Sequence, residues 1–206
     1  MENQELSNEL YLKVSSQMSE YRFKHTAEVE KMAVRLGELY APEKLHALRA
    51  AALLHDITKE LPYDGQIAIC EEKGIALSAA ELNSPKTLHA ITAAAVIGDR
   101  YPKFATEEII SAVRWHTTGK ADMSICEKLI FLADYIDMSR TFEDCILVRE
   151  YFFRARPEEM NREERAEHLR KTLILCFDLT LKSLIEEGAP ISPNTVDARN
   201  YLVTEK

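Results

Sequence analysis

Leu53-Leu54-His55-Asp56-Ile57-Thr58-Lys59 is the stretch that decides the fold. It closes an apolar, helix-forming run that begins at Ala47. His55 can offer a metal ion an imidazole nitrogen, and Asp56 can offer a carboxylate that bridges to a second ion. Lys59 lies four residues after His55 and three after Asp56, so it shares their face if the helix continues.

Other residues with metal-ligand side chains occur in similar settings, each within or beside an apolar helical pattern. They are His25, His89, His116 and Asp134. Taken alone, each histidine could be an ordinary surface or core residue. Together with His55-Asp56 they form the set that a two-metal phosphohydrolase needs. His46 and His168 lie among charged neighbours, and we expect them at the surface.

Asp134 interrupts the run Leu129 to Ile136, which otherwise suits a protein core. A buried carboxylate loses several kcal/mol of solvation unless a cation or hydrogen bonds compensate for it. Its side chain could therefore point outward, form a salt bridge with an arginine such as Arg140, or bind a metal. The residue alone does not decide between these alternatives.

Helical periodicity is nearly continuous along the chain, and the alternation typical of strands is almost absent. Ser78 to Glu81 and Ser124 to Glu127 have the spacing of capping boxes, which start helices. We predict an all-α fold as a single domain over 1–206, with a motif core over 22–140 and C-terminal helices over 142–202. The predicted elements include helices over 5–20, from His25 onward, 142–155, 162–187 and 195–202.

Composition excludes several classes of function. The formal net charge is −8, which disfavours nonspecific binding to nucleic acids or anionic membranes. Apolar runs fall short of the roughly 18 residues that span a bilayer, and the polar stretch Met1–Glu20 does not resemble a signal peptide. We therefore expect a cytoplasmic protein. The cysteines form no CxxC pair, and we expect reduced, buried thiols at Cys70, Cys126, Cys145 and Cys176.

Several segments carry a resemblance to a known family. They are Arg22-Phe23-Lys24-His25-Thr26, the stretch 53–59, Leu88-His89-Ala90, Trp115-His116-Thr117-Thr118-Gly119, Leu132-Ala133-Asp134-Tyr135-Ile136 and the tail over 192–201. The chain resembles the HD-domain superfamily of metal-dependent phosphohydrolases, and within it the YqeK-type symmetrical bis(5'-nucleosyl)-tetraphosphatases. It departs from that family at Asp137-Met138, where Glu-Pro is usual.

This resemblance implies an HD-domain fold with a central di-metal site. One metal would be held by His25, His55, Asp56 and Asp134, and the second by His89, His116 and the bridging Asp56. The family is associated with iron, and this ligand set also suits Mn, Co or Ni. Asp56 and Lys59 would be catalytic. Substrate contacts would come from Arg22, Lys59, Thr117, Thr118, Gly119 and Arg140. Arg22 and Arg140 could equally be surface or core-bridging residues, and the role of Arg199 is open.

The activity that the resemblance implies is symmetrical hydrolysis of diadenosine tetraphosphate or a related dinucleoside polyphosphate. A metal-activated hydroxide would yield two ADP, or GDP-type products from a guanosine substrate. A homodimer without nucleic-acid or membrane partners is expected. One alternative is an HD-type phosphohydrolase for another nucleotide, such as a nucleoside mono- or triphosphate or a guanosine alarmone. A non-enzymatic module with a structural metal is the other, although structural sites normally have four ligands.

Overall fold

The computed structural model describes residues 2–205, with side chains described over 6–205. The described chain is helical and contains no strand, which confirms the all-α prediction. Its helices are α1 (Glu2–Ser15), α2 (Glu20–Tyr40), α3 (Leu45–Leu54), α4 (Tyr63–Glu72), α5 (Ala79–Leu82), α6 (Pro85–Arg100), α7 (Glu107–Trp115), α8 (Ile125–Ile136), α9 (Glu143–Arg154), α10 (Arg162–Glu186) and α11 (Pro193–Thr204). None of these helices combines the length and apolar character that a membrane crossing requires.

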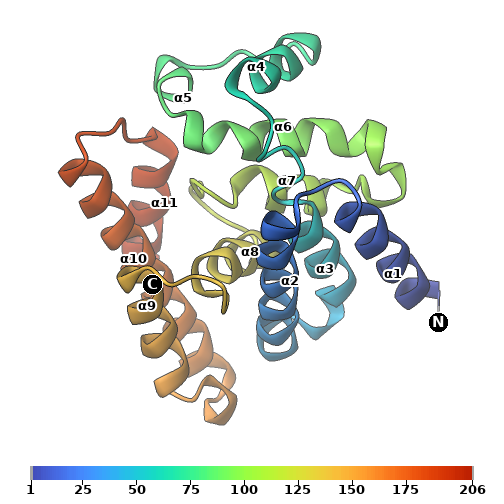
Figure 1. The fold of residues 1–206 in the computed structure, drawn as a ribbon. Helices are drawn as coiled ribbons and strands as arrows, with labels where there is room; N and C mark the ends of the chain where they lie inside the picture. Colours follow the sequence, from blue (N-terminus) through green and yellow to red (C-terminus); the bar gives the residue numbers. More distant parts are fainter. Residues whose placement is uncertain (1, 206) are drawn as a thin grey trace.

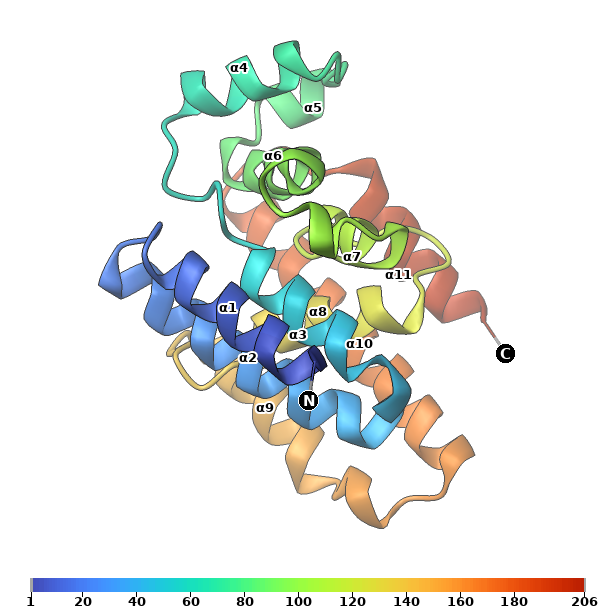
Figure 2. The same cartoon turned by 90° about the vertical axis from the view of Figure 1, so that its right-hand side faces the viewer.

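The centre of the molecule is formed by α2, α3, α7 and α8, which pack against one another (Figure 1). Their contact faces bury aliphatic side chains such as Leu36, Leu48 and Leu132 completely. Helix α6 packs on α7 and carries α4 and α5 on its outer side (Figure 2). Helices α9, α10 and α11 form a second group beside α8, and α1 packs on α3. This arrangement brings the ends of α3, α7 and α8 toward the middle.

Both capping boxes predicted from the sequence are present in the structure. Ser124 accepts a hydrogen bond from the backbone N–H of Glu127, and the Glu127 carboxylate accepts one from the Ser124 N–H at 2.6 Å. Ser78 forms the same reciprocal pair with Glu81. Such a cap typically contributes about 1 kcal/mol. The Ser124 cap fixes where α8, the helix that carries Asp134, begins.

Two helix boundaries differ from the predicted ones near the important histidines. The side chain of Ser19 accepts the N–H of Arg22, so α2 begins at Glu20, and His25 lies inside the helix instead of opening it. Helix α3 ends at Leu54, so the helix does not continue through His55 and Asp56 to Lys59, as the spacing of these residues allowed. The residues beyond it form tight turns, with the Lys59 N–H bonded to the Asp56 carbonyl at 2.9 Å.

The surface position predicted for His168 is wrong. This residue is 7% exposed, and its Nε2 lies 3.0 Å from the carbonyl oxygen of Phe152, on which its ring also stacks. His46 is half-buried against Phe104. The expectation for the cysteines is confirmed, because all of them are free and buried.

Candidate metal centre

The six candidate ligands converge at the centre of the helical bundle, although they come from distant parts of the chain. His25 comes from α2, His55 and Asp56 from the turn after α3, His89 from α6, His116 from the end of α7 and Asp134 from α8. Asp56 and all four histidines are buried, and the Asp134 side chain is 15% exposed. The sequence prediction therefore selected residues that the fold places together.

The Asp56 carboxylate lies in the middle, with its two oxygens directed to different sides. Its Oδ2 is 3.5 Å from Nε2 of His55 and 3.9 Å from Nε2 of His25. Its Oδ1 is 3.2 Å from Nε2 of His89 and 3.9 Å from Nε2 of His116. A carboxylate that bridges two metal ions needs this division of its oxygens between two groups of ligands.

Asp134 joins the side of the cluster that contains His25 and His55. Its Oδ1 is 3.0 Å from Nε2 of His25 and 3.8 Å from Nε2 of His55. The potential ligand atoms of His25, His55 and Asp134 all lie within 4.8 Å of one another, as do those of His55, Asp56 and His116. Arg140 also donates to Asp134 Oδ1 at 2.5 Å. The salt bridge considered as an alternative for Asp134 thus coexists with the cluster.

The orientation of the histidine rings fits a metal site. Nδ1–H of His55 donates to the carbonyl of Ala52 at 2.6 Å, and Nδ1–H of His116 donates to that of Val113 at 2.7 Å. Each bond places the proton on Nδ1 and leaves the lone pair of Nε2 directed inward, as is typical of metal-binding histidines. Nε2 of His55 is buried and has no hydrogen-bond partner among the described residues. A divalent transition metal would satisfy it.

At Asp56, Asp134, His89 and His116 the electrostatics of the cluster favour the protonation states that metal binding requires. Burial opposes ionisation of Asp56, but the surrounding imidazoles outweigh it and hold the pKa of this carboxyl well below its usual value. Burial also opposes ionisation of Asp134, while the Arg140 guanidinium and His25 hold its pKa well below normal. Burial lowers the pKa of both His89 and His116, which keeps them neutral.

His25 has outer partners that the sequence analysis did not identify as functional. Its Nδ1 lies 3.0 Å from Oγ of Ser139 and 3.4 Å from Oδ2 of the fully buried Asp137. Burial lowers the pKa of His25, but its hydrogen bonds to Asp134 and Asp137 outweigh that effect and raise the pKa to about 9. Asp137 therefore orients His25, although it was noted in the sequence only as a departure from the family pattern.

The loop after α8 is itself held in place by Arg149 of α9. Arg149 donates to the carbonyls of Ile136 and Arg140 at 2.8 Å each, and also to that of Asp137. A second anchor is Thr58, whose hydroxyl donates to the carbonyl of His89 at 3.0 Å. These two side chains fix the backbone around the cluster without belonging to it.

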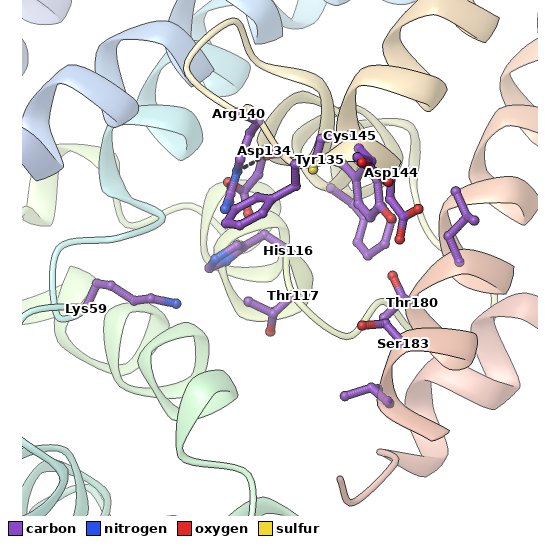
Figure 3. A pocket seen from close by; sticks show the side chains of 15 residues that line it. Lys59, His116, Thr117, Asp134, Tyr135, Arg140, Asp144, Cys145, Thr180 and Ser183 are labelled. Carbon is purple, nitrogen blue, oxygen red and sulfur yellow. Dashed lines mark hydrogen bonds and ion pairs between the residues drawn. The ribbon is translucent and has the colours of Figure 1, made fainter. Parts of the chain in front are cut away.

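A pocket of about 510 Å³ opens beside the cluster, between α8, α9 and α10 (Figure 3). Lys59, Thr117 and Arg140 line it, together with His116 and Asp134. Nζ of Lys59 lies 3.1 Å from Nδ1 of His89, and burial lowers the pKa of this lysine. Oγ1 of Thr117 is buried and has no hydrogen-bond partner within the described part of the chain. These groups are placed to contact a ligand at the cluster.

Other predicted substrate contacts make bonds within the protein. Arg22 donates to Asp56 Oδ2 at 2.7 Å, so it touches the cluster directly. The Thr118 hydroxyl donates to the carbonyl of Gly119 at 3.0 Å. Gly119 has a φ of +63°, and a Cβ there would approach Cζ of Phe177 to 2.6 Å, which indicates a structural role for this glycine. Arg199, whose role was open from the sequence, donates to Asp178 at 2.8 Å.

An all-helical fold that gathers histidines around an adjacent His-Asp pair is typical of HD-domain proteins. The HD-domain family matches residues 22–139, more than half of the chain. The protein therefore belongs to the HD-domain family.

Curated relatives and a solved structure agree with this assignment. The chain is 29% identical over 193 residues to the symmetrical bis(5'-nucleosyl)-tetraphosphatase of Halalkalibacterium halodurans, covering 94% of this chain and 95% of that protein. It is 28% identical over 195 residues to the enzyme of the same name from Bacillus subtilis, covering 93% of this chain and 94% of that protein. A crystal structure of a predicted HD superfamily hydrolase involved in NAD metabolism, from Clostridium acetobutylicum, is 31% identical with a TM-score of 0.82 and covers 97% of both chains.

Replacing Asp56 with alanine tests the cluster. We expect Asp56→Ala to lose metal and to reduce turnover by more than the roughly 100-fold that loss of an outer partner costs, because both groups of ligands lose their shared oxygen donor. Metal content by mass spectrometry and steady-state kinetics measure the two effects.

Two further variants calibrate this result. Asp137→Asn should weaken metal affinity by about 10- to 100-fold, because it alters the residues that orient His25 and leaves all six candidate ligands in place. His46→Ala lies outside the cluster and should retain full metal content. If Asp56→Ala keeps the turnover and the metal content of the wild type, the assignment of Asp56 as a shared metal ligand is wrong.

Proposed function

We propose that this protein is a metal-dependent symmetrical bis(5'-nucleosyl)-tetraphosphatase that hydrolyses diadenosine tetraphosphate to two ADP. The observation that carries the proposal is the division of the Asp56 carboxylate between two histidine pairs. The names of the curated relatives, which align over most of this chain, support the choice of substrate and reaction.

In this proposal His25, His55, Asp56 and Asp134 hold one metal ion, and Asp56, His89 and His116 hold the other. Two such ions, which we expect to be iron, would activate water and neutralise phosphate oxygens. Mn, Co or Ni would suit the same donors. The outer partners keep the imidazoles of His25, His55 and His116 in their orientation, and the low pKa of Asp56 and Asp134 keeps both carboxylates ionised.

The pocket residues would position the phosphate chain. Lys59 supplies a cation beside His89, where negative charge on a leaving phosphate would develop. The buried hydroxyl of Thr117 can donate to a phosphate oxygen, since it has no partner among the described residues. Arg22 and Arg140 already pair with Asp56 and Asp134, so they would act on substrate only after rearranging.

The alternative that remains is an HD-type phosphohydrolase acting on another nucleotide. The Clostridium acetobutylicum protein is described as involved in NAD metabolism, which makes NAD a necessary comparison substrate. A substrate screen that includes NAD, nucleoside mono- and triphosphates and a guanosine alarmone separates these activities.

The cleavage position provides the test of the proposed reaction. Hydrolysis of diadenosine tetraphosphate in heavy-oxygen water should give ADP as the first product, with one label on the β-phosphate of one of the two ADP molecules. We expect this because the cluster and Lys59 act together on an inner phosphate, with a whole ADP as leaving group. ATP and AMP as first products would contradict symmetrical cleavage.

A cytoplasmic location and a homodimer are also part of this proposal. The homodimer is supported by the outer face of α9, where Ile146, Leu147 and Tyr151 are exposed and line one groove. Single exposed apolar side chains are common, but several together on one helix face are typical of an interaction site.

The charges on this face match a second copy of the same helix. In an antiparallel pair about a two-fold axis, Glu143 would lie opposite Arg154 of the partner subunit, and Ile146 opposite the partner's Tyr151. Glu143 and Arg154 line the same groove and are both exposed. A self-complementary face of this kind is what a two-fold symmetric dimer requires.

Charge reversal tests this interface. Glu143→Arg and Arg154→Glu should each weaken the dimer by at least about tenfold in Kd, because each brings like charges together. The double variant should restore the dimer, since the pairing is exchanged. Analytical ultracentrifugation measures the association, and Lys103→Glu on another surface is the control. Monomeric wild-type protein, or a dimer unaffected by the single reversals, would contradict this arrangement.

A further inference from the structure

A second, smaller pocket adjoins the pocket beside the metal centre. Its volume is about 220 Å³, and it lies between the start of α6 and the connection from α10 to α11. Thr117, Thr180 and Leu184 line both pockets, so the two pockets meet at these residues. In Figure 3, Thr117 follows His116 at the cluster, and Thr180 faces it from α10. A ligand that extends beyond the metal centre can therefore reach the second pocket.

The walls of the second pocket suit an uncharged, flat group. Apolar surface comes from Pro85, Leu184, Ala189 and Pro190, and the side chains of several serines and threonines add hydroxyl groups. Ligand sites commonly combine apolar walls with a few polar groups that fix orientation. A purine ring has apolar faces and a hydrogen-bonding edge, so it matches this lining.

The charges around the second pocket do not favour phosphate. Lys86 is the one basic residue among the described residues that line it. Its Nζ is paired with the Glu187 carboxylate at 3.3 Å, and both side chains are exposed to solvent. The first pocket, by contrast, contains Lys59 and Arg140 beside the cluster. The distribution of charge therefore separates a phosphate site from a neighbouring site for a neutral group.

We propose that the second pocket binds one nucleoside of a dinucleoside polyphosphate, while the other nucleoside occupies the outer part of the first pocket. This inference rests on the proposed function. The phosphate chain passes from one pocket to the other at the residues that line both, beside the metal centre. There the buried Oγ1 of Thr117, which has no partner among the residues described, contacts the chain. The arrangement explains how a compact helical protein accommodates a substrate with two nucleosides.

Filling the second pocket tests this proposal. Ala189→Trp places an indole in the pocket, whereas Ile185→Trp adds the same group at a position that is 67% exposed and outside it. Ala189→Trp should raise KM for diadenosine tetraphosphate at least about tenfold. It should change kcat/KM for adenosine 5'-tetraphosphate, which has a single nucleoside, by less than about twofold. Ile185→Trp should leave KM for diadenosine tetraphosphate and kcat/KM for adenosine 5'-tetraphosphate within about twofold of the wild-type values.

Binding of ADP provides a readout that is independent of turnover. Calorimetric titration of the metal-loaded wild type should give two ADP per chain, and Ala189→Trp should retain one. Ser192→Trp fills the pocket from another wall and decides the question if Ala189→Trp does not fold. An unchanged KM and two bound ADP in these variants would overturn the second nucleoside site. Wild-type protein that binds two ADP but does not hydrolyse diadenosine tetraphosphate would instead overturn the proposed function.

Discussion

The structure depends on the placement of two carboxylates, Asp56 and Asp134, inside a helical core. Ionised carboxylates lose solvation when buried, so each must face compensating groups. Arg22 contacts Asp56 at 2.7 Å and Arg140 contacts Asp134 at 2.5 Å, while four imidazoles surround the pair. Arginines alone could neutralise these carboxylates, but they do not explain why the imidazole nitrogens also converge on them. Metal ions account for both features.

The helices satisfy this constraint by ending or beginning around one point. Helix α3 stops at Leu54, which frees His55 and Asp56 to adopt the turn that follows. Helix α7 stops at Trp115, and His116 reaches back to the carbonyl of Val113. Main-chain carbonyls at the ends of helices lack helical partners, so they are available to orient histidine side chains. The same feature that terminates these helices therefore prepares their histidines to bind a metal.

Much of the centre could be predicted from sequence because local patterns place His55, Asp56, His116 and Asp134 at or near helix ends. The outer partners could not be predicted in this way. Ser139 is 114 residues from His25, and only the folded chain brings them together. His168 was misplaced because its charged sequence neighbours lie on other faces of α10, whereas the helical period aligns it with the buried Thr172.

Metal stoichiometry tests the central claim most directly. Metal-free wild-type protein should be titrated with a divalent transition metal under anaerobic conditions, with binding followed by calorimetry. The division of the Asp56 oxygens between two histidine pairs predicts saturation at two ions per chain. Saturation at one ion, or the absence of specific binding, would contradict a di-metal centre built around this carboxylate.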